Sequence, residues 1–291
     1  MSKIRFGPAG NSESFYAQGY KSTVQTPAWL AGMGLDAFEY SFGRGVRLGE
    51  EHARAIAQEA QQHDVALSVH MPYFINLAVE DEERREKNVG YFINSLTSAS
   101  QMGAKRAVFH PGSASGGDRG EILERAKVFL KEIIARVDEQ GYGNITLCAE
   151  TMGKINQLGS LQEVIGLCGV DERVFPAIDF GHLHTRGLGA IQSREDYVAI
   201  LDALENGVGM ERTRNMHIHF SRIEFTKGGE KMHHTFADKQ YGPDFEPLAE
   251  LLAERGYTPV CICESKGTMG EDAAEMRKMY ENAKKRLLPR L

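Results

Sequence analysis

The chain has 291 residues, of which 42% are hydrophobic and 25% are charged, and its formal net charge is −6. This composition is ordinary for a soluble globular protein and excludes a low-complexity chain. The negative charge argues against a protein that coats nucleic acid by charge alone, but it leaves room for an enzyme that grips a phosphate backbone through one local face or through bound cations.

Short β-branched or aromatic runs alternate with helical patterns along the whole chain. The predicted strands comprise residues 4–7, 37–41, 66–70, 107–110, 145–150, 174–179, 216–220 and 260–264. The helical stretches between them include residues 50–63, 83–102, 119–140, 160–168, 194–206 and 247–255, where apolar residues recur at three- and four-residue spacing. Strands that alternate with helices predict parallel βαβ units. Eight such units favour a closed (β/α)8 TIM barrel over an open sheet.

Nothing in the sequence divides this pattern into separate parts. No linker or composition break interrupts it, and no Gly-rich dinucleotide-binding motif opens the first helix, so we expect one α/β domain over residues 1–291. The four cysteines form no C-x-x-C pair, which is typical of buried thiols in a reducing compartment. The chain begins without an apolar signal segment, and no stretch approaches the length of a membrane span. We therefore expect a cytoplasmic, monomeric protein without a membrane partner.

Residues able to bind a metal ion recur at the carboxyl ends of six successive predicted strands. They are His70, His110, Glu150, Asp179 with His182 three residues on, His217 with His233 in the loop that follows, and Glu264. In a barrel these ends form a ring around one mouth, where active sites of this fold occur. Imidazole and carboxylate without thiolate are typical of zinc, manganese or iron sites that keep positions open for water or substrate. The pattern predicts a multi-metal site of a kind suited to phosphoester hydrolysis.

A single histidine or carboxylate at a strand end has a simpler explanation. Such a histidine is usually a hydrogen-bonded core or surface residue, and such a carboxylate often caps the following helix. The occurrence of such residues at the same end of six successive strands makes that explanation a poor one for the set.

Ordered short segments support a more specific interpretation. They are SVHMPYFINL at 68–77, FHPG at 109–112, AET at 149–151, IDFGH at 178–182, MHIH at 216–219, HH at 233–234 and CE at 263–264. This ordered set resembles the endonuclease IV family of abasic-site DNA-repair enzymes, within the wider xylose-isomerase-like barrels. The match runs from the third predicted strand to the eighth, whereas the first sixty residues match poorly. The resemblance implies a zinc-dependent hydrolase that cleaves the phosphodiester 5′ to an abasic site in double-stranded DNA.

The resemblance also implies roles for individual residues. A first zinc is assigned to His70, His110 and Glu150; a second to Glu150, Asp179, His217 and Glu264; and a third to His182 and His233. Glu150 and Glu264 are the candidate catalytic residues, and Mn2+ is an alternative metal. Tyr73 matches a family residue close to the nucleotide that such an enzyme extrudes from the duplex.

Two departures from the family pattern affect these assignments. The family pairs its third-metal histidine with an aspartate two residues upstream, and that position is Lys231 here, whose ammonium repels a cation. The third site is therefore in doubt unless Glu230 substitutes through a one-residue shift, or the extra histidines His184, His219 and His234 compensate. The loop at residues 42–48 is also shorter than the family's DNA-penetrating loop. Its Arg44 and Arg47 are candidate phosphate contacts, although loop arginines are more often solvated.

Two alternatives remain open from the sequence alone. The tetrad of Glu150, Asp179, His217 and Glu264 also resembles the single Mn2+ or Mg2+ site of sugar isomerases and epimerases in the same superfamily, and Glu39 would fit such a pocket. His70 and His110 argue against this alternative, because a one-metal isomerase needs no further imidazoles at the metal. The other alternative is a barrel without activity that only binds a ligand, and the many ligand-type residues argue against it.

Overall fold

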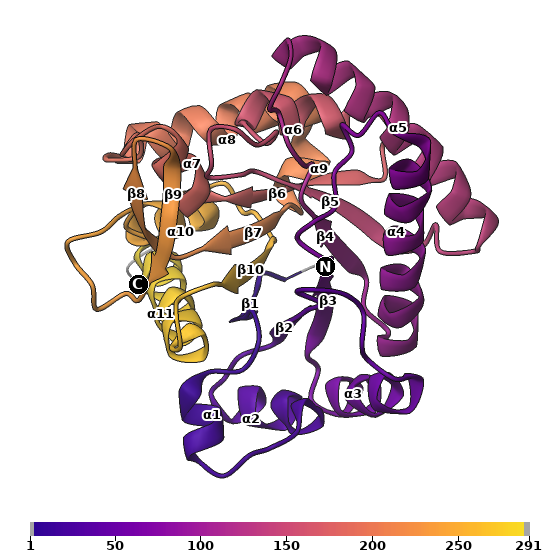
Figure 1. Ribbon diagram of the computed structural model, residues 1–291. Helices are drawn as coiled ribbons and strands as arrows, with labels where there is room; N and C mark the ends of the chain where they lie inside the picture. Colours follow the sequence, from indigo (N-terminus) through magenta and orange to yellow (C-terminus); the bar gives the residue numbers. More distant parts are fainter. Residues whose placement is uncertain (1–2, 288–291) are drawn as a thin grey trace.

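The computed structural model describes residues 3–287. Within them, eight parallel strands form one sheet in the order β1-β10-β7-β6-β5-β4-β3-β2. A parallel bridge between Ala9 and Glu39, and a hydrogen bond of 3.0 Å from Asp36 N to Phe6 O, join the two ends of this order and close the barrel. The barrel strands are β1 (Arg5–Pro8), β2 (Ala37–Ser41), β3 (Ala66–His70), β4 (Arg106–Phe109), β5 (Thr146–Glu150), β6 (Val174–Asp179), β7 (His217–Phe220) and β10 (Val260–Cys263). Helices flank this barrel (Figure 1), and the predicted (β/α)8 TIM barrel is confirmed.

The helices begin where the sequence supplies caps. Asp81 accepts a hydrogen bond of 2.9 Å from Arg84 N, and Asp118 accepts one of 3.0 Å from Glu121 N. Gly103 ends its helix with a φ of 69°, a conformation that glycine adopts without strain. The helices are α1 (Glu13–Ala17), α2 (Thr26–Gly32), α3 (Glu50–Gln62), α4 (Glu82–Met102), α5 (Arg119–Glu139), α6 (Leu161–Cys168), α7 (Phe180–Arg186), α8 (Arg194–Val208), α9 (Met210–Arg214), α10 (Glu246–Glu254) and α11 (Met269–Leu287), with the 3-10 helix η1 (Thr23–Gln25) between α1 and α2. Among the described residues, none of these helices has the length and hydropathy that a membrane span requires.

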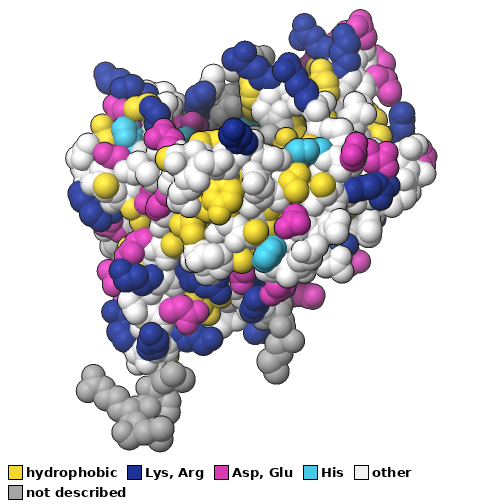
Figure 2. Space-filling model, turned by 90° about the horizontal axis from the view of Figure 1, so that it is seen from below, with side chains coloured by type: hydrophobic (Ala, Val, Ile, Leu, Met, Phe, Trp, Pro, Cys, Tyr) yellow, Lys and Arg dark blue, Asp and Glu magenta, His cyan; other side chains and the backbone are white. Residues whose placement is uncertain are grey.

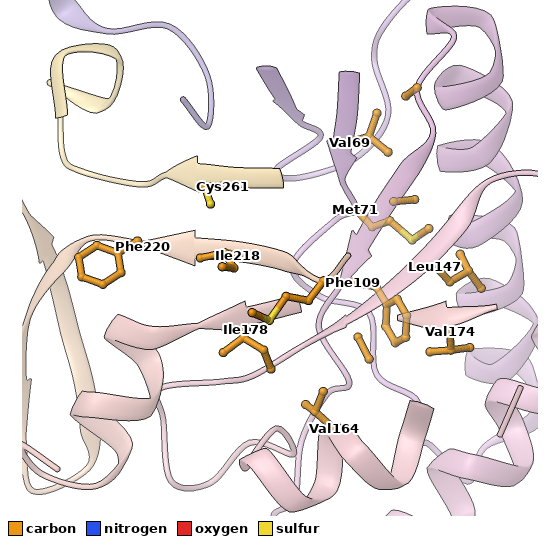
Figure 3. Packing of buried hydrophobic residues seen from close by; sticks show 14 of the residues in the cluster. Val69, Met71, Phe109, Leu147, Val164, Val174, Ile178, Ile218, Phe220 and Cys261 are labelled. Carbon is orange, nitrogen blue, oxygen red and sulfur yellow. The ribbon is translucent and has the colours of Figure 1, made fainter. Parts of the chain in front are cut away.

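The hydrophobic core lies between the outer faces of the strands and the helices. Figure 3 shows Ile178 and Ile218 on neighbouring strands, with Val164 of α6 among the side chains of the same cluster. Because successive side chains of a strand point to opposite faces, the residues on either side of Ile218 face the barrel interior. These are His217 and His219, and both are fully buried.

The same alternation builds two layers of side chains inside the barrel. The strand register pairs Asp179 with His219 and Ser41 with His70. Two residues earlier in the same strands, it pairs Ala177 with His217 and Glu39 with Ser68. We call the first set the upper layer: His70, His110, Glu150, Asp179, His219 and Glu264. We call the second set the lower layer: Glu39, Ser68, Val108, Cys148, Ala177 and His217. The upper layer lies at the carboxyl ends of the strands, where TIM barrels place their active sites.

An antiparallel hairpin follows β7, where the sequence predicted only a long loop. It consists of β8 (Arg222–Thr226) and β9 (Gly229–His234). Its tip is attached to the loop after β5 through hydrogen bonds from Glu230 N to Gly153 O, at 3.2 Å, and from Ile155 N to Gly228 O, at 3.1 Å. A side chain at Gly229 would lie 2.1 Å from Gly153 O, so only glycine permits this approach. The hairpin is thus fixed beside the barrel mouth (Figure 1).

Candidate metal centre

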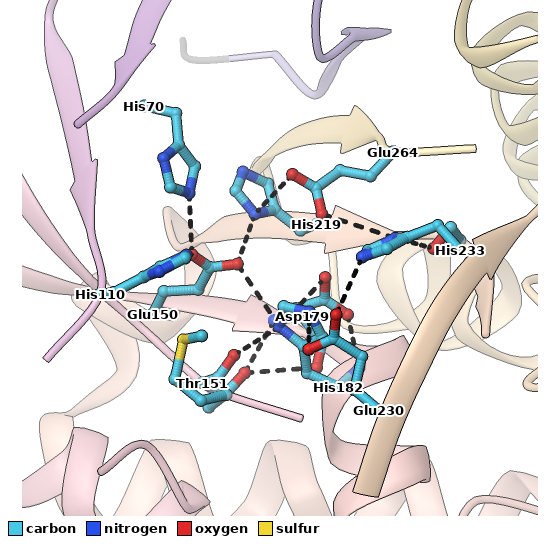
Figure 4. Close-up of polar contacts among 12 residues, drawn as sticks. His70, His110, Glu150, Thr151, Asp179, His182, His219, Glu230, His233 and Glu264 are labelled. Carbon is cyan, nitrogen blue, oxygen red and sulfur yellow. Dashed lines mark hydrogen bonds and ion pairs between the residues drawn. The ribbon is translucent and has the colours of Figure 1, made fainter. Parts of the chain in front are cut away.

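Glu150 is the centre of the upper layer. Its Oε2 lies 3.0 Å from His70 Nε2 and 3.0 Å from His110 Nε2, and its Oε1 lies 2.9 Å from His219 Nδ1. Three imidazoles from three different strands therefore converge on one carboxylate that is 1% exposed (Figure 4). His70, Glu150 and His219 have ligand atoms within 4.8 Å of one another, a separation that a single cation can span.

A second group shares Glu150 with the first. Ligand atoms of Glu150, Asp179, His219 and Glu264 all lie within 4.8 Å of one another. Asp179 is the N-cap of α7, because its Oδ1 accepts a hydrogen bond of 2.7 Å from His182 N. Its other oxygen, Oδ2, is buried without a hydrogen-bond partner among the described residues. A buried, unsatisfied carboxylate oxygen beside imidazoles fits a cation ligand, because a cation would supply the interaction that the protein withholds.

A third group lies between α7 and the hairpin. His182 Nε2 is 3.5 Å from Glu230 Oε2, and His233 Nε2 is 3.8 Å from Glu230 Oε1. The other nitrogen of His182, Nδ1, lies 2.8 Å from Thr151 O, which orients Nε2 toward Glu230. Figure 4 shows these three side chains beside the upper layer.

The sequence assigned His217 to the second group, and the structure puts His219 there. In β7 the two histidines face the same way but lie two residues apart, so only one can be level with the strand ends. The register places His219 opposite Asp179, whereas His217 lies opposite Ala177 in the lower layer. There His217 Nε2 is 3.0 Å from Glu39 Oε2. The geometry therefore favours His219 over His217 as a member of this group.

The third group differs from its expected form because of a β-bulge. Glu224 pairs with Met232 and Phe225 pairs with Glu230, so Lys231 is the additional residue on β9. A bulge reverses the face on which the preceding residues lie. Glu230, three residues before His233, consequently faces His233, and Lys231 points away and forms an ion pair of 2.6 Å with Glu224. Glu230, and not Lys231, is thus the residue that lies beside His182 and His233.

The candidate substrate residues lie at or near the cleft above the upper layer. This cleft has a volume of about 700 Å³, and Tyr73, Lys154, Lys231 and Lys266 are among its lining residues. Tyr73 is 52% exposed at its rim. Arg44 lines a neighbouring cavity, and Arg47 is exposed on the same loop. Figure 2 shows Lys and Arg side chains along the upper edge of the molecule.

The pKa values in the centre are set by two opposing effects, burial and the charges of neighbouring side chains. Burial would raise the pKa of Glu150, but His219 and His110 outweigh it and hold that pKa well below its ordinary value. Burial would lower the pKa of His70, but the contact with Glu150 raises it to about 9. Burial raises the pKa of Glu264, against the opposing influence of His219. The negative potential that favours a proton on these imidazoles also favours a divalent cation in its place.

Comparisons with known proteins agree with the fold. A family model described as a xylose isomerase-like TIM barrel matches residues 27–284. An uncharacterised protein of Methanocaldococcus jannaschii is 30% identical over 251 residues, which cover 86% of this chain and 89% of that protein. A probable endonuclease 4 of Acholeplasma laidlawii is 33% identical over 179 residues, which cover 60% of this chain and 59% of that relative.

Solved structures of two kinds share this fold. Endonuclease IV from Thermus thermophilus has a TM-score of 0.67 at 21% identity and covers 97% of this chain and 99% of its own. A D-tagatose 3-epimerase-like protein has a TM-score of 0.69 at 21% identity and covers 87% of this chain and 90% of its own. At these identities the likeness shows the barrel and leaves the activity open. The chain belongs to the xylose isomerase-like TIM barrel family, and its relatives include probable endonucleases 4.

Proposed function

We propose that this protein is a metal-dependent phosphodiesterase that cleaves double-stranded DNA 5′ to abasic sites. The observation that carries the proposal is the position of His70 and His110, whose Nε2 atoms each lie 3.0 Å from the same oxygen of Glu150. The tetrad of Glu150, Asp179, His219 and Glu264 alone can hold one cation. Two further imidazoles on Glu150 provide for a second cation that shares this carboxylate, an arrangement suited to phosphodiester chemistry.

The groups described above would hold two or three zinc ions. His70, His110 and Glu150 would hold the first, and Glu150, Asp179, His219 and Glu264 the second. His182, Glu230 and His233 would hold the third. Bound cations supply charge stabilisation at a phosphoryl group and lower the pKa of the attacking water.

The protein's own carboxylates would then handle the proton. Glu264 is 18% exposed and lines the cleft, whereas Glu150 is 1% exposed and Asp179 is fully buried. Because burial raises its pKa, Glu264 is the upper-layer carboxylate best suited to accept a proton from water at Oε2. His233 Nδ1 lies 3.9 Å from that oxygen and would contribute to the local potential, while it is held by Ser221 Oγ at 2.8 Å.

Residues around the cleft would bind the polymer. The cations of Lys154 and Lys266 offer contacts to backbone phosphates, which are the main source of affinity for DNA. Tyr73 offers an exposed ring on which an unpaired base can stack. A net charge of −6 makes such a local face necessary, because the whole chain does not attract DNA.

The test combines metal counting with a nicking assay. We expect two or three zinc ions per chain and cleavage of a duplex that contains one tetrahydrofuran abasic analogue. The variant His70→Asn should lower nicking by about 100-fold or more, because it removes a ligand. His52→Asn is the matched control, since His52 is exposed on α3 and should be without effect. One metal per chain together with no nicking would contradict the proposal.

One observation favours a second candidate, a sugar epimerase. The tetrad could hold a single cation without His70 or His110, and a D-tagatose 3-epimerase-like protein shares the fold. Turnover of a ketose by protein with one Mn2+ per chain, retained in His70→Asn, would support this candidate over the nuclease.

A further inference from the structure

The lower layer contains a buried polar cluster that the proposed function leaves without a role. Glu39 and His217 are both 0% exposed inside the barrel. Glu39 Oε1 lies 2.8 Å from His219 Nε2, and Glu39 Oε2 lies 3.0 Å from His217 Nε2. Ser68 Oγ donates a hydrogen bond of 2.8 Å to Glu39 Oε2. One carboxylate therefore contacts an imidazole of each layer.

The polar atoms of this cluster depend on one another. Glu39 Oε1, His219 Nε2 and both ring nitrogens of His217 are buried, and none forms a well-aligned hydrogen bond with any described residue. Their short separations leave Glu39 as the available acceptor for both imidazoles. An unpaired N–H at this depth is costly, and the separation of 2.8 Å makes Glu39 Oε1 the nearest acceptor for the His219 N–H.

His219 faces the upper layer with its other nitrogen. Nδ1 lies 2.9 Å from Glu150 Oε1 and 3.6 Å from Glu264 Oε1. An imidazole that binds a cation through Nδ1 must carry its proton on Nε2, and a carboxylate that accepts this proton fixes both the tautomer and the ring orientation. We propose that Glu39 is a positioning residue that holds His219 with Nδ1 directed at the cation site, and that His217 and Ser68 hold Glu39. The inference rests on the proposed metal centre.

An additional cation between Glu39, His217 and His219 is the competing explanation, since their ligand atoms also lie within 4.8 Å of one another. It requires His219 to bind one cation through Nε2 and another through Nδ1, and therefore to lose both ring protons. The positioning role needs only the neutral imidazole. It also leaves His219 free to complete the tetrad with Glu150, Asp179 and Glu264.

The test measures metal affinity and a spectroscopic signature in purified full-length protein. Glu39→Gln keeps the volume of the side chain but cannot accept hydrogen bonds from two imidazoles and a hydroxyl at once. We expect it to lower Co2+ affinity, measured by chelator competition, by about 10–100-fold. In the Co2+-loaded protein, the exchangeable N–H signal of the ligand His219 in the paramagnetic NMR spectrum should shift or be lost. His217→Gln should have a smaller effect in the same direction.

Controls separate this inference from the metal centre itself. Cys148→Ala alters the same buried layer, where the Cys148 thiol bonds the carbonyl of Thr146, and it should leave Co2+ affinity within about 2-fold, while thermal unfolding checks that each variant is folded. Wild-type protein that binds no metal would refute the metal centre. Wild-type protein that binds metal, with Glu39→Gln equal to it in affinity and spectrum, would refute only the positioning role. Loss of one additional cation in Glu39→Gln, with the remaining affinities unchanged, would also overturn it.

Discussion

Glu163 joins two helices to the loop that supports the hairpin, and its substitution gives a quantitative test of the structure. The carboxylate caps α6, since Oε2 accepts hydrogen bonds of 2.8 Å from Ser160 N and 2.9 Å from Gly159 N. It also forms an ion pair with Arg119, whose guanidinium bonds the carbonyls of Ile155 and Gln157 in the same loop. The change Glu163→Gln removes the charge while it preserves the size of the side chain.

The expected magnitude follows from the pKa of Glu163. Burial would raise this pKa, but Arg119 and the two backbone N–H groups lower it from 4.5 to about 2. At about 1.4 kcal/mol per pKa unit, that difference corresponds to about 3 kcal/mol of free energy of unfolding at neutral pH. The Glu163 side chain is only 9% exposed, but that of its partner Arg119 is 38% exposed, so solvent screening makes about 3 kcal/mol an upper value. For a chain of 291 residues the loss amounts to a fall of up to about 5 °C in Tm.

The sign of the pH dependence is also fixed. Because the pKa is lower in the folded protein than in the unfolded chain, the ionised carboxylate stabilises the fold above pH 4.5, and this stabilisation is lost as the pH falls toward 2. The neutral glutamine lacks it at every pH. The difference in stability between wild type and Glu163→Gln should therefore be full at pH 7 and less than half as large at pH 3.

Urea unfolding at pH 7 and pH 3, followed by circular dichroism, measures both quantities. Glu124→Gln is the matched control, because Glu124 on α5 is 67% exposed and pairs with Lys127 at the surface, so the change should cost less than about 0.5 kcal/mol. The reasoning is refuted if Glu163→Gln matches this control at pH 7, or if its deficit is the same at both pH values.

Three further predictions concern the metal centre and the cleft. Glu230→Gln should remove about one cation per chain. Lys231→Asp should leave the metal content unchanged, because the bulge turns Lys231 away from His233. Elemental analysis distinguishes the two variants, and a gain of metal in Lys231→Asp would contradict the bulge. In a chelator titration, His219→Asn should lower metal affinity by about 100-fold and His217→Asn by much less. The reverse order would instead favour His217 as the ligand that accompanies Glu150, Asp179 and Glu264. Tyr73→Ala should raise KM for an abasic duplex by about 5–10-fold with metal content unchanged, and an unaltered KM would exclude stacking on this ring.

The sequence was sufficient to predict the barrel because its pattern is local. Each of the eight predicted strands agrees with an observed barrel strand to within one residue at either end. Apolar residues that face the helices, such as Ile178 and Ile218, alternate with residues that face the interior, and turns follow at regular intervals. The ligand-type residues at the strand ends followed from the same pattern.

The sequence left the ligand assignments open where position depends on pairing between distant segments. His217 and His219 have the same periodicity, and only the register of β7 against β6 decides which one is level with Asp179. The exchange of Lys231 for Glu230 likewise depends on a bulge in a hairpin where the sequence predicted a loop. Neither register shift nor bulge leaves a clear signal in a single strand, so a single sequence predicts the set of candidate ligands better than their partners.

The candidate metal centre draws its residues from two parts of the fold, the strand ends of the barrel and the β8–β9 hairpin. The tetrad around Glu150 comes entirely from strand ends, so its geometry is fixed by the closed sheet. The third group depends on Glu230 and His233, and the backbone bonds between the hairpin and Gly153 set their position. Changes in the hairpin can therefore alter the third group while the tetrad stays intact. The proposed third cation site could therefore be gained or lost through the loops alone, and in this chain Glu230 lies beside His182 and His233 in that group.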